Sequence, residues 1–176
     1  MRIRNFGRNL DFHPKNYFEP NSSEEVLDAL ATNRGTRIRT MGRLHSWSQA
    51  PVSEDTLLNL KNLNGVKIEQ IDGVFFVRVA GGCQIKRLIQ KLDEAGLALP
   101  SQGLITEQSI AGAISTGTHG SGKSSLSHYV LELQVADYDP TSGAPRIRTI
   151  HAGEELQAAR CALGCLGVIL EVKLPC

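Results

Sequence analysis

One segment decides how this sequence is interpreted: Gln108-Ser109-Ile110-Ala111-Gly112-Ala113-Ile114-Ser115-Thr116-Gly117-Thr118-His119-Gly120-Ser121-Gly122. It combines small and hydroxyl-bearing residues with four glycines. Glycine allows the backbone to turn sharply and allows a ligand to approach the main chain closely. Further glycines gather at 81–82, 103 and 164–167, and the chain has 17 in all. The pattern predicts a protein that binds a ligand through backbone amides.

The same segment leads into the phosphate-loop pattern G-x-x-x-x-G-K-[ST], which spans Gly117 to Ser124. In a nucleoside triphosphatase the loop amides would hold phosphates, Lys123 would reach the terminal phosphates and Ser124 would bind magnesium. Such a loop must open an α-helix, because the helix N-terminus forms much of the phosphate site. Only Ser125 to Tyr129 precede a segment with strand periodicity. A phosphate-loop NTPase therefore ranks third among the functions considered. No G-x-G-x-x-G lies between a strand and a helix, so a Rossmann site is not expected.

Local patterns predict an α+β chain. Ser22 and Ser23, followed by Glu24 and Glu25, indicate the start of a helix that ends near residues 33–35. Strands are expected at 37–41, 56–60, 74–79, 130–135, 146–151 and 168–174, and further helical segments at 83–95, 109–113 and 154–162. Strands joined by turns favour an antiparallel sheet with helices against one side. We expect a small strand-helix lobe over about residues 1–100, and this antiparallel sheet with its helices over about 101–176.

Composition excludes several classes of function. The chain has 176 residues, of which 41% are hydrophobic and 21% charged, as in ordinary globular proteins. A net charge of +1 gives no indication of a basic surface that would bind nucleic acid. No apolar run reaches the ~18 residues of a membrane span, and the N-terminus lacks the apolar core of a secretory signal. A cytoplasmic location is therefore expected. The four cysteines lack metal-type spacing, so free thiols and no metal are expected.

Three segments together resemble a known family. They are Met41-Gly42-Arg43-Leu44-His45-Ser46-Trp47-Ser48, the opening segment at 108–122, and Leu163-Gly164-Cys165-Leu166-Gly167-Val168-Ile169. In order and separation they resemble the FAD-binding (PCMH-type) domain of the vanillyl-alcohol oxidase / p-cresol methylhydroxylase superfamily. The second segment is most similar to the aldonolactone and alditol oxidase branch. The resemblance implies one two-lobed FAD-binding domain over residues 1–176, with FAD as cofactor.

The resemblance also implies which residues meet the cofactor. The FAD pyrophosphate needs donors, and consecutive backbone N–H groups in a turn form an anion-binding concavity. The family places that turn at residues 42–46, with hydroxyl groups and glycines of the second segment nearby and backbone of the last strand beside the adenine and flavin edges. Each single serine or threonine also suits turn chemistry, and the last-strand residues also suit an apolar core. The candidate residues are Gly42, Arg43, Leu44, His45, Ser46, Ser109, Gly112, Ser115, Thr118, His119, Gly120, Val168 and Ile169.

Two histidines and one tryptophan each have two possible roles. Several family members bond the histidine at the position of His45 covalently to the flavin, which requires a neutral imidazole nitrogen within reach. The alternative for His45 is a role in hydrogen bonds of the turn. Many relatives have a glycine before this histidine, where this chain has Leu44. His119 either lies beside the cofactor or stabilises its loop, and Trp47 either packs or lies beside the flavin ring.

The resemblance implies an oxidoreductase that oxidises a hydroxyl carbon of a sugar lactone or alditol, with FAD as hydride acceptor. Family members continue into a second domain that covers the flavin and binds substrate, so we expect those groups, including any catalytic base, outside this chain. The alternative is a non-catalytic module that binds a flavin or nucleotide. An uncovered flavin face usually marks an interaction surface, which predicts self-association or a partner chain.

Overall fold

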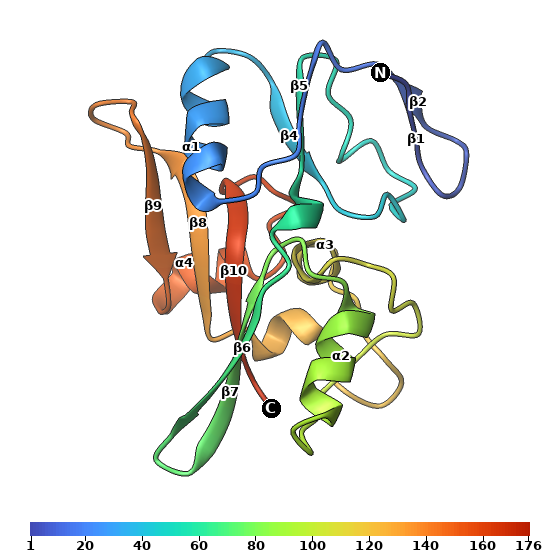
Figure 1. Ribbon diagram of the computed structural model, residues 1–176, viewed down its shortest axis with the longest axis vertical. Coiled ribbons are helices and arrows are strands. Elements are labelled where there is room, and N and C mark those ends of the chain that lie inside the picture. Colours follow the sequence, from blue (N-terminus) through green and yellow to red (C-terminus); the bar gives the residue numbers. More distant parts are fainter.

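The computed structural model describes all 176 residues as three sheets with helices between and around them (Figure 1). The strands are β1 (Ile3–Arg4), β2 (Asp11–Phe12), β3 (Asn16–Phe18), β4 (Ile38–Met41), β5 (Thr56–Asn59), β6 (Val66–Ile71), β7 (Val74–Ala80), β8 (Glu132–Tyr138), β9 (Pro145–Ile150) and β10 (Val168–Pro175). The α-helices are α1 (Ser23–Thr32), α2 (Ile85–Asp93), α3 (Ile110–Ser115) and α4 (Gly153–Ala159), and the 3-10 helices are η1 (Leu60–Asn62) and η2 (Leu126–Tyr129).

The first half of the chain builds a small parallel unit. Its sheet has the order β3-β5-β4, with both pairs parallel. The Ser22 side chain accepts a hydrogen bond from the Glu25 N–H and caps α1, which buries Val26, Ala29 and Leu30. A core cluster joins this face of α1 to residues of β5, β8 and β10. The helix therefore packs between the parallel sheet and the larger sheet beside it.

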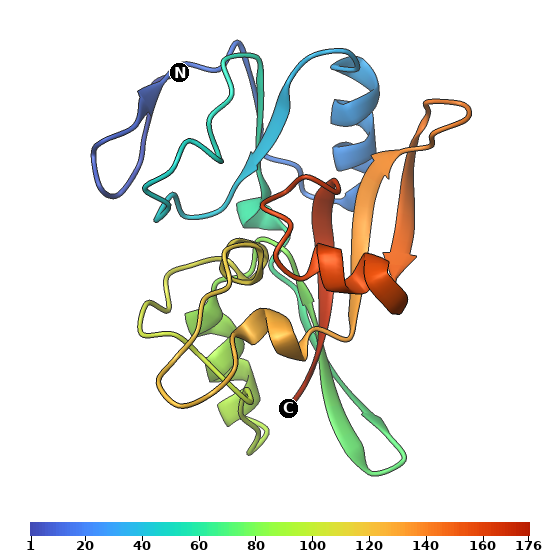
Figure 2. The same ribbon diagram turned by 180° about the vertical axis from the view of Figure 1, so that it is seen from behind.

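The rest of the chain forms an antiparallel unit with the strand order β6-β7-β10-β8-β9. A cluster of 19 buried residues fills the space between one face of this sheet and α2, α3, η2 and α4. Figure 2 shows these helices gathered on that side of the sheet. This arrangement confirms the predicted α+β fold with an antiparallel sheet and helices.

Strand β10 separates the two clusters. Val168 and Leu170 belong to the cluster around α1, whereas Ile169 and Val172 belong to the cluster under the helices of the antiparallel unit. Its register against β8 shifts between Ile169 and Glu171. Side chains on the two faces of β10 thus belong to two different core clusters.

The predicted boundary near residue 100 is corrected by the sheet pairing. Strands β6 and β7, with α2, were expected in the first lobe, but they belong to the antiparallel unit. The reason is that β7 pairs with β10, so that Arg78 lies opposite Lys173. Local periodicity identifies a strand but does not reveal a partner so distant in the sequence. The units divide near residues 60–65 instead, between η1 and β6.

Two other features bear on function. The phosphate-loop pattern at 117–124 is followed by η2, a 3-10 helix of four residues, and not by an α-helix. The helix that a nucleoside triphosphate site requires is therefore missing. The longest helix has ten residues, and none has the length and apolar character to span a bilayer.

Candidate cofactor site

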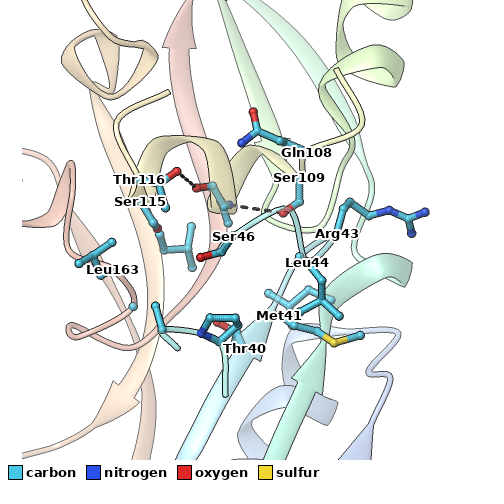
Figure 3. A pocket seen from close by; sticks show the side chains of 18 of the residues that line it. Thr40, Met41, Arg43, Leu44, Ser46, Gln108, Ser109, Ser115, Thr116 and Leu163 are labelled. Carbon is cyan, nitrogen blue, oxygen red and sulfur yellow. Dashed lines mark hydrogen bonds between the residues drawn. The ribbon is translucent and has the colours of Figure 1, made fainter. Parts of the chain in front are cut away.

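A pocket of about 290 Å³ opens where the two units meet. The parallel unit supplies residues from 39 to 51, and the antiparallel unit supplies Gly81 and residues from 108–116 and 163–169. Figure 3 shows Ser46, Ser109 and Ser115 around this hollow, with Leu163 on the wall near the C-terminal strand. The segments that carry the family resemblance are thus brought together from distant parts of the chain.

The loop after β4 presents unpaired donors. None of the backbone N–H groups of residues 43–47 donates a hydrogen bond within the protein. Leu44 has φ of 54°, and a left-handed residue among such amides helps to form an anion-binding nest. A Cβ on Gly42 would lie 2.2 Å from Ser109 Oγ, so only glycine lets this loop approach α3. The loop therefore offers a cradle for an anion at the junction of the units.

The opposite wall is made of short side chains on a packed base. Ser109 caps α3, with its Oγ accepting from the Gly112 N–H at 3.4 Å, while Ile110 and Ile114 are buried beneath. A Cβ on Gly81 would lie 2.1 Å from the Ile169 carbonyl oxygen, so the backbones meet without side chains between them. This wall is therefore fixed in shape by close packing of backbone against backbone.

Arg39 ties the two walls together. Its Nε donates to the Ala50 carbonyl at 2.6 Å and its Nη2 donates to the Leu163 carbonyl at 2.9 Å. Leu163 lies in a turn closed by the Cys165 N–H on the Ala162 carbonyl at 2.9 Å. One side chain thus fixes the C-terminal turn of the pocket to the parallel unit.

His45 is the pocket residue with an unsatisfied atom. Its ring packs against Phe6, with centroids 4.9 Å apart and an interplanar angle of 31°. The Nδ1 atom is buried and has no hydrogen-bond partner. A buried polar atom without a partner is costly, so this nitrogen is a strained point next to the pocket. Together with the unpaired loop amides, His45 fits a large anionic cofactor with a ring to place beside the imidazole.

Nine of the thirteen predicted residues line the pocket: Gly42, Arg43, Leu44, His45, Ser46, Ser109, Gly112, Ser115 and Ile169. The other four lie outside the lining. Thr118 exchanges hydrogen bonds with the side chain of Gln108, which does line the pocket. His119 Nδ1 lies 3.0 Å from the Gly120 carbonyl, a contact within its own loop. A Cβ on Gly120 would meet the Gln102 carbonyl at 2.4 Å, so this glycine serves loop packing. Val168 lies in the core beside α1.

Several lining residues were not predicted. Gly81 and Gly167 belong to glycine clusters that the sequence singled out, and Gln108 begins the opening segment. No sequence pattern indicated Arg39, because its role depends on carbonyls that are distant in the sequence. No group of three metal-ligating side chains is found, and all four cysteines are free.

Comparison with known proteins identifies the family. Residues 14–141 match the FAD binding domain family. The chain belongs to this family. The FAD-binding domain and the cofactor FAD, expected from the sequence, are thereby confirmed.

Three similar proteins are oxidases by name. The FAD-binding domain is 50% identical over 173 residues to a long-chain alcohol oxidase of an uncultured marine euryarchaeote, covering 98% of this chain and 36% of the relative. It is 40% identical over 166 residues to a putative D-arabinono-1,4-lactone oxidase of Neurospora crassa, covering 90% and 29%. A solved solvent-stable cholesterol oxidase has the same fold, with a TM-score of 0.86, 23% identity, and coverage of 99% and 36%. The chain spans about a third of the length of these proteins.

Proposed function

We propose that this FAD-binding domain serves an oxidoreductase that oxidises the hydroxyl-bearing carbon of a sugar lactone or alditol. Bound FAD supplies the hydride acceptor. The observation that carries the proposal is the loop at residues 43–47, which lines the pocket and whose backbone N–H groups are unpaired within the protein. The lactone oxidase name of a 40%-identical relative supports the substrate class.

Each wall has its own task in the proposal. The loop amides hold the pyrophosphate, because consecutive N–H groups bind an anion without a metal. Ser115, Gly112 and Gly81, which line the pocket, are proposed to contact the rest of the cofactor. His45 is proposed as the point of covalent attachment, because the residue lines the pocket at the position where the family resemblance implies such a histidine.

The groups that bind substrate and remove its hydroxyl proton are proposed to lie outside residues 1–176, because the relatives are about three times as long. The pocket lining includes two exposed apolar side chains, Trp47 and Leu163. We propose that a further domain, a partner or a second copy covers it, and that the protein acts in the cytoplasm. Size exclusion of the flavin-loaded chain tests the covering, and a stable monomer with tightly bound FAD counts against it.

An absorption spectrum of the purified chain tests the cofactor, with oxidised-flavin bands as the expected result. A colourless protein that takes up no added FAD would refute the proposal. Anaerobic addition of a sugar lactone or alditol to the flavin-loaded protein, joined to its substrate-binding part, should then bleach those bands. Persistent flavin bands with every substrate favour a non-catalytic binding module.

A second substrate class has its own support, since the 50%-identical relative is named a long-chain alcohol oxidase. The same bleaching experiment separates the two classes. Bleaching by a fatty alcohol and not by a lactone or alditol would replace the substrate named above, while the hydroxyl-carbon chemistry would stand.

Covalent attachment is tested on a denaturing gel. The wild-type band should fluoresce as a flavin after electrophoresis, and the His45→Ala band should not. His119→Ala is the matched control, because this exposed histidine contacts only its own loop, and its band should keep the fluorescence. Complete release of flavin from the wild type by acid precipitation would contradict attachment.

A further inference from the structure

The N-terminal hairpin contacts the cofactor loop. Strands β1 and β2 pair Ile3 with Phe12 and Arg4 with Asp11, and the chain turns through residues 5–10 between them. Figure 1 shows this hairpin at the edge of the molecule, where Ile3 and Phe12 pack against Leu57 of β5. A short hairpin alone is marginally stable, so these contacts and those of its turn hold it in place. Asn5 in this turn is only 3% exposed, although the hairpin lies at the edge of the molecule.

Three hydrogen bonds run from the turn to consecutive parts of the cofactor loop. The Phe6 N–H donates to the Leu44 carbonyl, Asn5 Nδ2 donates to the Ser46 carbonyl, and Asn9 Nδ2 donates to the Trp47 carbonyl, each at 2.9 Å. The turn thus binds carbonyls of the loop and leaves the N–H groups of residues 43–47 unpaired. The carbonyls are held on the hairpin side, and the donors remain for the pocket.

Asn5 joins the turn to the loop with its whole side-chain amide. Its Nδ2 donates to Asn9 Oδ1 at 2.7 Å and to the Ser46 carbonyl, and its Oδ1 accepts from the Leu10 N–H at 3.0 Å. An amide has two donor hydrogens and one acceptor oxygen, and all are used. A carboxylate would keep the acceptor and lose both donors, so aspartate is a selective test.

Phe6 and Gly7 place side chains of the loop. The Phe6 ring packs on the His45 imidazole, although Phe6 itself is 68% exposed. A Cβ on Gly7 would lie 3.2 Å from Trp47 Cε2, so the indole rests directly on the backbone of the turn. The exposed aromatic residue is thus explained by its contact with a pocket histidine and not by a core.

We propose that the turn at residues 5–10 positions the cofactor loop, with Asn5 orienting the loop amides and Phe6 orienting the His45 imidazole. This inference rests on the proposed function, because the loop and His45 are the parts assigned to FAD. Both are positioning residues, since they act through the loop and not on the cofactor.

The amide role is tested where binding is reversible. In a His45→Ala background, FAD binding to the full chain is followed by quenching of Trp47, the single tryptophan. Adding Asn5→Asp should weaken FAD binding about tenfold, because the two hydrogen bonds that Asn5 Nδ2 donates are lost. The control is Arg2→Ala, which breaks an exposed ion pair with Asp11 in the same hairpin and should change the dissociation constant less than about twofold. Far-UV circular dichroism below the unfolding transition checks that each variant is folded.

The imidazole role is tested by non-additivity. Phe6→Leu should leave FAD affinity within about twofold when His45 is already alanine, because the ring it orients is gone. With His45 present, Phe6→Leu should change the visible circular dichroism of bound flavin and lower the fraction retained after acid precipitation. Equal effects in both backgrounds would overturn this half of the inference.

The outcomes separate this inference from the function beneath it. A chain that binds no FAD, with or without His45, refutes the proposed function and this inference together. Binding that Asn5→Asp leaves within about twofold overturns the inference alone. If Asn5→Asp does not fold, Asn9→Ala replaces it. That variant removes the bond to the Trp47 carbonyl from an exposed side chain, and unchanged FAD affinity there also overturns the inference.

Discussion

The two walls of the pocket differ in what holds them. The loop at residues 43–47 has unpaired amides and carries Trp47, which is 68% exposed. The facing wall stands on fully buried Ile110, Ala113 and Ile114, and its glycines meet other backbone. One wall is held by hydrogen bonds from a hairpin and by packing of Leu44 on the small cluster beneath it, whereas the other stands on the largest core cluster. The difference shows how a site can combine unpaired donors with a rigid shape.

The largest expected effect comes from the place where the walls join. A Cβ on Gly82 would lie 1.7 Å from the Leu60 carbonyl oxygen, a backbone atom of the parallel unit. Gly82→Ala should therefore lower the free energy of unfolding by about 3 kcal/mol or more, because backbone must move. Urea unfolding measures this. Gly65→Ala is the matched control, since no atom lies within 4 Å of its Cβ position; equal stability of the two variants would contradict the packed junction.

The packed side should also respond to alkaline pH. Burial raises the pKa of the Cys83 thiol from its ordinary 9.0 to about 11. Since the unfolded thiol loses its proton first, the contribution is full below pH 9 and is lost as the pH rises to 11, about 2 kcal/mol in total. Cys83→Ala should lack this part of the alkaline decline in unfolding experiments between pH 8 and 11. Identical pH profiles would argue against a desolvated thiol.

The link between the walls is tested by Arg39→Lys, which keeps the charge and loses the two-armed donor. Because Arg39 holds the Ala50 and Leu163 carbonyls, the substitution should weaken FAD binding about tenfold. Titration in the His45→Ala background measures the dissociation constant. Arg37→Lys is the control, since the exposed Arg37 engages neighbours through its backbone. An equal loss of affinity in both variants would show that the effect does not depend on the bridge.

The smallest effect on stability is expected at the exposed wall. Trp47→Phe should change the free energy of unfolding by less than about 0.5 kcal/mol, because the side chain is mostly in solvent. Thermal unfolding followed by far-UV circular dichroism measures it without the tryptophan signal. A loss above about 1 kcal/mol would show that the indole is part of the fold and would weaken the contrast between the walls.

Helices and strands could be predicted where a single local pattern, such as a cap or an apolar run, identifies them. The cap at Ser22 and the apolar spacing after it predicted α1 within a residue or two, and the apolar run at 74–79 predicted β7. The structure adds β1, β2, β3 and β6, which the sequence did not indicate. The strands before α1 have only two or three residues each, too few for periodicity to register.

The site could be predicted where residues meet the pocket through motif segments. The family resemblance indicated the turn at 42–46 and Ser109, and these residues line the pocket. Asn5 and Arg39 were not found, since each acts on carbonyls more than ten residues away. Every residue has a backbone carbonyl, so the sequence does not show which carbonyl a distant side chain binds.

Strand β10 has a consequence for the synthesis of the protein. Arg78 of β7 bonds to Glu171 across a separation of 93 residues, and both cores use β10 as a wall. While the chain is being made, the hairpin of β6 and β7 therefore emerges long before its neighbouring strand, and one edge stays open even where α2 already covers its apolar face. Contacts so far apart slow folding, and open edges invite aggregation. We therefore expect neither core to close until residues 168–175 are available.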